Sequence, residues 1–478
     1  MKESIKIFFN KTPALLYALF LLFGFLLALE IYSPLLPASL LFYVFKNKQR
    51  MIFLLLMISA FLLVKSRYEF PQKEITGIAR ISLTSIREAK YKGFVYKGVV
   101  KEMVPDGEDV SIASSLPCSF FSPLKQECNQ DYLVHGILRE GKGKYYFLKS
   151  KEEWIPIDHS KNLVSLRYDL KKRTFAYLKK HITDSKVAGF LSGLATGELR
   201  DDVLLKAFEK RGLSHLLAIS GFHFAMIALT FHFIFRVFLP PKWNAAFLML
   251  LLTGYFLFIG NSPSVMRAWI IASVSLVGLL IEKRANGINS LGIALMISLL
   301  FNPLSALNAG FQLSYLATAG ILFLFSPLEI LLRPLLPKGD HFIVNFCRDS
   351  LALGLAVHVA ILPHLLHLFH KMPLHGLFYN LFFPALVTLC LIALILGCLL
   401  HLLIPPLGLL VHKFNALYTG MVLRLMEIPL CPHKTLYVEK VPPLVLTLYL
   451  TLVFGGAILL RSYFEKRREE DRLEFCFF

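Results

Sequence analysis

The segment 212–228, GLSHLLAISGFHFAMIA, carries three residues that could transfer a proton or attack a carbonyl: His215, Ser220 and His223. Ser220 and His223 are three residues apart and would be neighbours on one face of a helix. One interpretation is an intramembrane hydrolase, which needs a base within hydrogen-bond reach of Ser220 and an oxyanion hole. The chain has no GxSxG motif, and we find no third member of a triad. We therefore favour a hydrogen-bonded polar patch that lines a cavity.

A second set of polar residues, in GNSPSVMRAWI, includes an arginine within an apolar run. Asn261, Ser264 and Arg267 recur every third residue and would cover an arc of about 120° on a helix. A guanidinium is always charged and is costly to expose to lipid. Arg267 must therefore meet a carboxylate, backbone carbonyls, water or an anionic substrate. Two roles remain open for it: a contact that joins helices, and a wall of a hydrophilic path.

A third polar face lies in NPLSALNAGFQLSYL, where Ser305, Asn308, Gln312 and Tyr315 would fall within about 80° of one another on a helix. Polar groups are costly in lipid and face the interior of a bundle or a water-filled cavity. Together with the polar patch of 212–228, these two faces are enough to line a hydrophilic path. The expected channel-lining residues are His215, Ser220, His223, Asn261, Ser264, Arg267, Asn308 and Gln312.

Histidines cluster in HVAILPHLLHLFH, at positions 358, 364, 367 and 370. A metal site would need carboxylate or cysteine ligands close to these histidines, and the sequence has none there. No Walker motif, HExxH or HxHxDH sequence occurs in the chain. We therefore predict no catalytic residues, no metal and no cofactor, and transport rather than enzymatic activity.

The composition is that of a membrane protein. The 478 residues are 56% hydrophobic and only 17% charged, whereas a soluble domain carries about 25% charged residues. This excludes a cytosolic enzyme and a disordered chain, and it favours a polytopic, mainly α-helical membrane protein. The net charge of +19 favours anionic partners, either lipid head groups or nucleic acid. Part of that charge is the cytoplasmic excess of Lys and Arg that multi-span proteins carry.

A membrane-crossing helix needs about 20 mostly apolar residues. Such runs occur near 13–31, 51–65, 214–238, 245–260, 264–281, 288–301, 309–327, 350–369, 376–404 and 442–461, with a shorter run at 34–45. The stretch 405–428 is apolar but also contains charged residues and a histidine, so it is either a weak span or an interfacial helix. The sequence therefore predicts a membrane bundle of ten to twelve spans.

Basic segments set the expected orientation. Positive residues flank the N-terminus, the loops 46–50 and 282–284 and the C-terminal tail, and short basic loops stay in the cytoplasm. With twelve spans these four sites fall on one side, so we expect both termini inside and residues 66–212 outside. The first apolar run is expected to stay as an anchor rather than to be cleaved.

The outer region has two expected parts. Five segments rich in β-branched and aromatic residues, separated by turn sequences, predict a small barrel of the OB type: GFVYKGVVKEM, DVSIASS, DYLVHGILRE, GKYYFLKS and EWIPI. Residues 163–211 predict a basic helical segment, which suits an amphipathic helix resting on lipid. The expected organisation is spans in 1–65, an OB-like β domain in 66–160, a basic helical segment in 161–212, a membrane channel domain in 213–461 and a cytoplasmic tail in 462–478.

The seven cysteines show no metal-binding spacing. Cys118 and Cys128 lie together in the polar outer region, where an oxidising environment permits a disulfide between them. Two free thiols are the alternative.

Three segments resemble, in order and spacing, the membrane core of the ComEC competence-protein family: GLSHLLAISGFHFAMIA (212–228), PSVMRA (263–268) and NPLSALNAGFQLSYLATAGI (302–321). The preceding SGLATGELRDDVLLKAFEKRG (192–212) and the order of domains also fit, so the resemblance covers nearly the whole chain. It implies a bacterial inner-membrane channel that admits single-stranded DNA during natural transformation. A competence motor and a DNA-receptor protein are the implied partners, and a homo-oligomer stays open.

Many members of that family end in a metallo-β-lactamase-like domain, thought to degrade the strand that is not imported. This chain ends soon after its last apolar run and lacks that domain's metal motif. We therefore expect another protein to degrade the second strand, where degradation is needed.

OB-folds bind single strands through a charged groove and aromatic side chains that stack on bases. Lysines and aromatic residues alternate in the expected strands, and the DNA-binding candidates are Tyr96, Lys97, Lys101, Lys142, Lys144 and Tyr145. A half-buried barrel whose polar face is simply basic would show the same pattern.

Two other functions remain open: a transporter of a small molecule or lipid-linked intermediate, and the intramembrane Ser/His hydrolase. A transporter of that class should show repeat-related halves, and the sequence shows no clear internal repeat.

Overall fold

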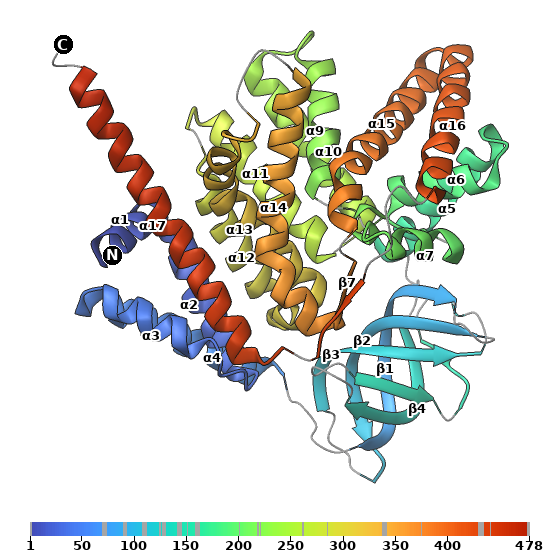
Figure 1. The fold of residues 1–478 in the computed structure, drawn as a ribbon. Helices are drawn as coiled ribbons and strands as arrows, with labels where there is room; N and C mark the ends of the chain where they lie inside the picture. The colour runs from blue at the N-terminus through green and yellow to red at the C-terminus, as the bar shows by residue number, and fades with distance from the viewer. Residues whose placement is uncertain are drawn as a thin grey trace. The chain divides into compact units, whose positions relative to one another are not determined.

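The computed structural model describes residues 2–68, 74–88, 93–107, 112–123, 126, 131–140, 146–150, 152–157, 163–199, 201–217, 219, 221–260, 262–283, 285–336, 342–373, 375–428, 435–439 and 441–475. They form two compact units, Ile58–Arg173 and a second that joins Met1–Met57 to Thr174–Phe478. The first is built around a β-barrel and the second is a helical bundle (Figure 1). The predicted fold class, mainly helical with a small barrel, is confirmed.

The barrel contains strands β1 (Ile75–Glu88), β2 (Phe94–Pro105), β3 (Ile112–Ser122), β4 (Asp131–Glu140) and β5 (Tyr146–Ser150), with a short β6 (Ile155–Pro156). The strand order is β1-β2-β3-β5-β4, and β4 pairs back with β1, which closes the barrel. β3 and β5 run parallel, whereas the other pairs are antiparallel. This agrees with the five-stranded Greek-key barrel of an OB-fold.

The sequence prediction nevertheless missed β1 and counted EWIPI as a full strand. EWIPI contributes only β6, which pairs with β4 at Tyr132 and Leu133. The strands were predicted from the turn sequences between them, and no such sequence was recognised before β1. The pairing of β1 with β2 shifts register twice, after Arg80 and after Leu83. Such bulges increase the twist and bend of a strand, which a long strand needs to curve around a barrel.

Aromatic side chains fill the barrel interior. Tyr96, Tyr132 and Tyr146 are almost completely buried. The Trp154 ring lies among them, with its centroid 5.3 Å from that of Tyr96 and 5.7 Å from that of Tyr132. Because successive residues of a strand point to opposite faces, the neighbours of these tyrosines point outward.

The described helices are α1 (Lys2–Lys11), α2 (Pro13–Ala28), α3 (Leu35–Val44), α4 (Asn47–Arg67), α5 (Leu163–His181), α6 (Ser185–Thr196), α7 (Asp202–Lys210), α8 (Ser214–Leu217), α9 (Gly221–Phe235), α10 (Pro241–Ile259), α11 (Pro263–Leu280), α12 (Gly287–Phe301), the 3-10 helix η1 (Pro303–Leu307), α13 (Ala309–Leu332), α14 (Phe342–Phe369), α15 (Gly376–Leu403), α16 (Pro405–Glu427) and α17 (Pro443–Phe475). Strands β7 (Lys371–Pro373) and β8 (Thr435–Tyr437) pair antiparallel.

Within the described residues, seven helices are long and apolar enough to cross a membrane: α4, α10, α11, α13, α14, α15 and α17. The pair α1 and α2 is bent by 102° and would make an eighth span if it crosses as one. The shorter apolar helices α3, α9 and α12 coincide with three more of the predicted runs. All predicted runs are therefore helical, but the number that meets the length criterion is below the predicted ten to twelve, because these three have at most 15 residues. The stretch 405–428 forms the continuous helix α16, which is not among the candidate spans.

Local sequence explains where several helices begin. Asp184, Asp201 and Asn308 precede α6, α7 and α13, and each side-chain oxygen accepts hydrogen bonds from backbone N–H groups of the first turn. Helices α10 and α11 instead begin at a proline, whose missing N–H costs nothing in the first turn. These N-terminal residues fix where α11 and α13, two helices of the candidate site, begin.

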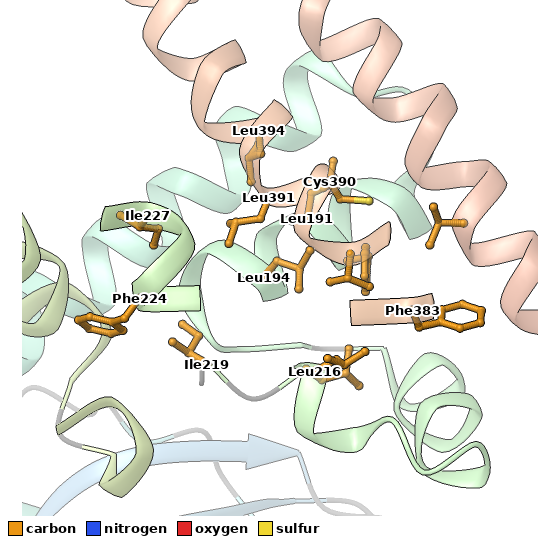
Figure 2. Packing of buried hydrophobic residues seen from close by; sticks show 14 of the residues in the cluster. Leu191, Leu194, Leu216, Ile219, Phe224, Ile227, Phe383, Cys390, Leu391 and Leu394 are labelled. Atoms are coloured by element: carbon orange, nitrogen blue, oxygen red, sulfur yellow. The ribbon is translucent and has the colours of Figure 1, made fainter. Parts of the chain in front are cut away.

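The core of the bundle is apolar and joins helices from distant parts of the sequence. Leu191 and Leu194 of α6 pack with Phe224 and Ile227 of α9 and with Leu391 of α15 (Figure 2). A second core places α2 against α4, where the Phe20 and Phe53 rings stack with centroids 4.2 Å apart. The helices next to the polar residues are thus held by hydrophobic packing.

Candidate functional site

Arg267, on α11, is the central residue of the candidate site. Its side chain is buried, with 8% of the residue exposed. Nη1 donates a hydrogen bond of 3.0 Å to the backbone carbonyl of Ser314 on α13. Nη2 lies against the first residue of α9, since a β-carbon on Gly221 would be only 3.1 Å from it. Arg267 therefore joins α9, α11 and α13.

The charge of Arg267 is not neutralised by a carboxylate of the described residues. Each ion pair found there involves other side chains. Its Nε is buried and has no hydrogen-bond partner within this part of the chain. By contrast, the buried Arg348 on α14 pairs with Glu329 at 3.2 Å and with Asp349 at 2.9 Å. Arg267 is thus a buried positive charge held by a neutral carbonyl.

Two of the predicted histidines lie on α8 and in the first turn of α9, the helix end that Arg267 approaches. His223 is buried in the first turn of α9, two residues after Gly221. His215 lies on α8 and is exposed, and it interacts electrostatically with His223 and with His358 of α14. Arg267 thus approaches the first turn of the helix that carries His223, and the role of these residues as channel lining remains a prediction. His358 was not among the predicted channel-lining residues.

Two polar residues of the predicted path lie outside the described residues. They are Ser220 and Asn261. The predicted i,i+3 relation between Ser220 and His223 therefore stays a prediction. Ser264 is half-buried at the second position of α11, one turn before Arg267.

Asn308 and Gln312 are engaged in bonds that shape the bundle. The Asn308 side chain caps α13, with its Oδ1 accepting from Gly310 N at 2.8 Å. Gln312 Nε2 donates to the Ala306 carbonyl at 2.7 Å, and its Oε1 accepts from His364 Nε2 of α14 at 2.7 Å. Asn308 therefore fixes the start of α13, whereas Gln312 connects η1 to α14 through both ends of its amide.

The histidines of α14 use their rings to hold the bundle. His358 Nδ1 donates to the Gly354 carbonyl at 2.8 Å, and His367 Nδ1 donates to the Val441 carbonyl at 2.6 Å. His364 bonds to Gln312 as described. In the described part of the chain, no group of three or more His, Cys, Asp or Glu residues could hold a metal ion.

The predicted DNA-binding residues of the barrel separate into three groups. Lys142, Lys144 and Tyr145 lie outside the described residues. Lys97 is exposed on β2, directly opposite Ser119 of β3. Tyr96 is fully buried and accepts a hydrogen bond from Gln126 N at 2.7 Å. A stacking role for Tyr96 is therefore wrong, because its ring belongs to the barrel interior.

Lys101 is exposed, but its charge is largely occupied by Asp131. The two form an ion pair of 2.7 Å, and Arg80 approaches the same carboxylate at 3.0 Å. Burial alone would raise the pKa of Asp131, but the hydrogen bonds from Lys101 and Arg80 outweigh it and lower the pKa below its usual value. The carboxylate is thus ionised at neutral pH and pairs with Lys101.

Exposed aromatic side chains that the sequence prediction did not select lie beside Lys97. Phe121 follows Ser119 on β3 by two residues, and Phe147 of β5 lies directly opposite Ser119. Both rings are about half exposed. The period-two pattern contained this information, since a strand that buries Tyr96 must turn Lys97 and its cross-strand neighbours outward.

Cys118 lies inside the barrel and forms no disulfide with another cysteine of the described residues. Burial raises its pKa to about 12, so the thiol stays protonated and unreactive at neutral pH. Cys128 lies outside the described residues. The pairing of the two cysteines remains a prediction.

Comparisons with known proteins agree with the sequence motifs. A family model described as "Competence protein" matches residues 195–463, the region that contains Arg267, His215 and His223. "ComE operon protein 3" of Bacillus subtilis (strain 168) is 28% identical over 302 residues, which is 61% of this chain but only 37% of that protein. This chain thus matches well under half of that relative's length. No solved structure matches. Since the family model covers more than half of its residues, the chain belongs to the competence protein family.

Proposed function

We propose that this chain forms a channel that admits single-stranded DNA across a bacterial inner membrane during natural transformation. The observation that carries the proposal is the buried charge of Arg267, which no described carboxylate neutralises. Family membership supplies the biological context. We infer a transport role rather than an enzymatic one.

A guanidinium that is hydrogen-bonded to a neutral carbonyl keeps its positive charge available. It can therefore attract an anion that moves past it. The Ser314 carbonyl fixes the orientation of Arg267 and leaves its positive charge uncompensated. Phosphate groups form charge-assisted hydrogen bonds with arginine that are stronger than neutral ones. An imidazole has no negatively charged form in this range of pH, so His215, His223 and His358 would not repel a phosphate.

The barrel would concentrate the strand before it enters. Lys97, Ser119, Phe147 and Arg139 lie directly opposite one another in turn on β2, β3, β5 and β4, and their backbones form one row across the barrel. Lysine charge attracts the phosphate backbone, while exposed rings such as Phe121 and Phe147 can stack on bases whatever the sequence. This row replaces Tyr96 in the proposed DNA surface, with Lys142, Lys144 and Tyr145 still as candidates.

The orientation is part of the same proposal. Both termini would face the cytoplasm and residues 66–212 would lie outside, so that the barrel meets DNA before the membrane bundle does. A competence motor and a DNA receptor would act with the chain, and assembly with further copies stays open. Binding to membrane lipid follows from the spanning helices themselves.

The test compares Arg267→Ala and Arg267→Lys in a transformable strain that carries no other copy of the gene. Entry of labelled single strands into the cytoplasm is measured and divided by the amount of the protein in the membrane. We expect Arg267→Ala to lower this ratio by an order of magnitude or more, and Arg267→Lys to keep part of it, because lysine keeps the charge but loses the planar fork.

Arg211 provides the matched control. It is equally buried in the same unit and also bonds to a backbone carbonyl, that of Glu427 at 2.9 Å. Arg211→Lys should change abundance and uptake together, so the ratio stays constant. Normal uptake per molecule by Arg267→Ala would remove Arg267 from the DNA path and leave the proposal without its main support.

A further inference from the structure

A groove of about 650 Å³ runs between α11 and α12. Its volume lies within the range of about 300–1,000 Å³ that is typical of ligand pockets. The walls are almost entirely apolar, with Trp269 and Val277 on α11 and Ile293 and Phe301 on α12. Lys283 is the charged residue of the lining. The groove is separate from Arg267, which does not line it.

The rim of this groove is apolar and open. Val277 is 40% exposed, Ile281 is 58% exposed and Phe301 is 68% exposed. α11 is long and apolar enough to cross a membrane, and α12 is a shorter apolar helix in contact with it. We therefore place the exposed side chains on both helices in hydrocarbon rather than in water. The material that fills such a groove is therefore hydrocarbon as well.

The length of the groove matches one leaflet of a membrane. Its lining on α11 extends from Trp269 to Ile281, over which an α-helix rises about 18 Å. Half of the hydrocarbon core of a bilayer is about 15 Å thick. An acyl chain that lies along α11 can thus reach from the middle of the bilayer to the end of this helix.

Lys283 stands at that end, in the turn that leads from α11 to α12. The turn folds back tightly onto the helix, with Lys283 N donating to the Gly278 carbonyl at 2.8 Å. A side chain at position 278 would not fit, because a β-carbon there would lie 2.8 Å from the Lys283 carbonyl oxygen. The glycine therefore places the lysine at the mouth of the groove.

The neighbouring acidic residue does not neutralise Lys283. Glu282 pairs instead with Lys242 of α10, at 2.7 Å. In the described part of the chain Lys283 forms no ion pair of its own. Its ammonium is thus available to an anion at the level of the lipid head groups.

We propose that this groove binds one phospholipid with an anionic head group, its acyl chain along α11 and α12 and its phosphate at Lys283. Basic pockets between membrane helices bind anionic head groups through the same chemistry. The inference stands independently of the DNA channel. The lipid would fill the gap between α11 and α12 and so support the helix that carries Arg267.

The test uses the purified full-length protein in detergent, with native mass spectrometry to measure bound phosphatidylglycerol or phosphatidylcholine at equal concentrations. We expect one phosphatidylglycerol to be retained, in preference to phosphatidylcholine. Lys283→Ala should weaken that binding about fivefold, the contribution of one lysine near a membrane surface. Val277→Trp, which adds an indole at the exposed rim, should abolish it.

Two matched controls lie outside the groove: Lys48→Ala, an exposed lysine beyond α3, and Leu250→Trp, an exposed apolar residue of α10. Both should retain the lipid as the unaltered protein does. Equal binding by Lys283→Ala and the unaltered protein would reject recognition of the head group. If the unaltered protein is a dimer without bound lipid, and Val277→Trp dissociates that dimer, the groove binds a second copy of the chain and not a lipid.

A measurement on the unaltered protein covers the case in which the variants fail to fold. Phosphatidylglycerol with a photoreactive group on its acyl chain is bound and cross-linked, and the labelled peptides are identified. Labels within residues 269–301 support the groove. Labels only elsewhere in the bundle overturn the proposal.

Discussion

Polar side chains within the helical bundle differ in whether their hydrogen bonds are complete. Gln312 uses both ends of its amide, one with the Ala306 carbonyl and the other with His364. Arg267 leaves its Nε without a partner in the described residues and its charge without a carboxylate. A complete set of bonds indicates a structural contact, whereas an uncompensated buried charge needs another explanation. We therefore separate Gln312 from Arg267, although the sequence placed them in the same path.

A structural role for Gln312 predicts a loss of stability. Gln312→Leu leaves the buried Nε2 of His364 without its partner, and such an orphaned group costs about 1–3 kcal/mol. Adding His364→Phe removes the orphan, so the double variant should be more stable than the sum of the single effects. Unfolding midpoints in detergent measure the interaction.

His358→Phe is the control for this prediction. His358 lies on the same helix as His364, and its hydrogen bond in the described residues stays within that helix, at the Gly354 carbonyl, so its replacement should cost less stability than Gln312→Leu. If the two effects at positions 312 and 364 simply add, the hydrogen bond between α13 and α14 makes no contribution and Gln312 returns to the list of path residues.

The sequence could predict which residue types matter, but not always which way they point. Arg267 is recognisable because a charge within an apolar run must have a reason to be there. Tyr96 was assigned to the surface, although its alternation with Lys97 implies opposite faces of one strand. His358 gave no such sign, because its electrostatic interaction with His215 joins residues far apart in the sequence, which local patterns do not reveal.

At the level of elements, the apolar runs of the sequence predicted where helices form better than they predicted which helices are long enough to cross a membrane. Each apolar run became a helix, but α3, α9 and α12 are too short to meet the length of about 20 residues by themselves. The barrel was recognisable from strands separated by turns, yet β1 was missed because no turn sequence precedes it. Closure of the barrel by β1 and β4 is a long-range pairing that local patterns do not contain.

The barrel makes a prediction about salt that distinguishes its lysines. Each phosphate that a lysine neutralises on a single strand adds about −0.7 to the slope of log affinity against log salt. Lys97→Ala should therefore flatten the slope by about that amount. Lys101→Ala should change it less, because Asp131 already pairs with Lys101. Fluorescence anisotropy with labelled single strands and the full-length protein in nanodiscs measures both slopes.

The comparison between these two lysines controls for the general loss of positive charge, since each variant removes one. A slope that changes more for Lys101→Ala than for Lys97→Ala would contradict the assignment of the outward row through Lys97, Ser119 and Phe147. Binding that does not depend on salt would exclude the phosphate backbone as the ligand of the barrel.

At the scale of the whole molecule, the orientation depends on one short helix. Under the eight-span count, α3 does not cross the membrane, so the barrel would lie on the same side as the N-terminus. If α3 crosses, the barrel lies on the opposite side. Its 10 residues rise only about 15 Å, half of the hydrocarbon thickness of about 30 Å. Length therefore argues against crossing, whereas the basic loop 46–50 argues for it, since that loop belongs in the cytoplasm.

We predict that the basic loop prevails and that α3 crosses with the help of its neighbours. A short span can be accommodated by local thinning of the bilayer at a modest cost per ångström, whereas Lys46, Lys48 and Arg50 outside would violate the charge rule together. Reporters fused after residues 47, 150 and 285 should then lie inside, outside and inside. Residue 285 lies inside in both topologies, provided that α9 crosses the membrane only if α3 also crosses it. The fusion at residue 285 is therefore the internal control. A reporter that is outside at 47 and inside at 150 would show that α3 stays on one side, and the barrel could then not be the first part of the protein to meet incoming DNA.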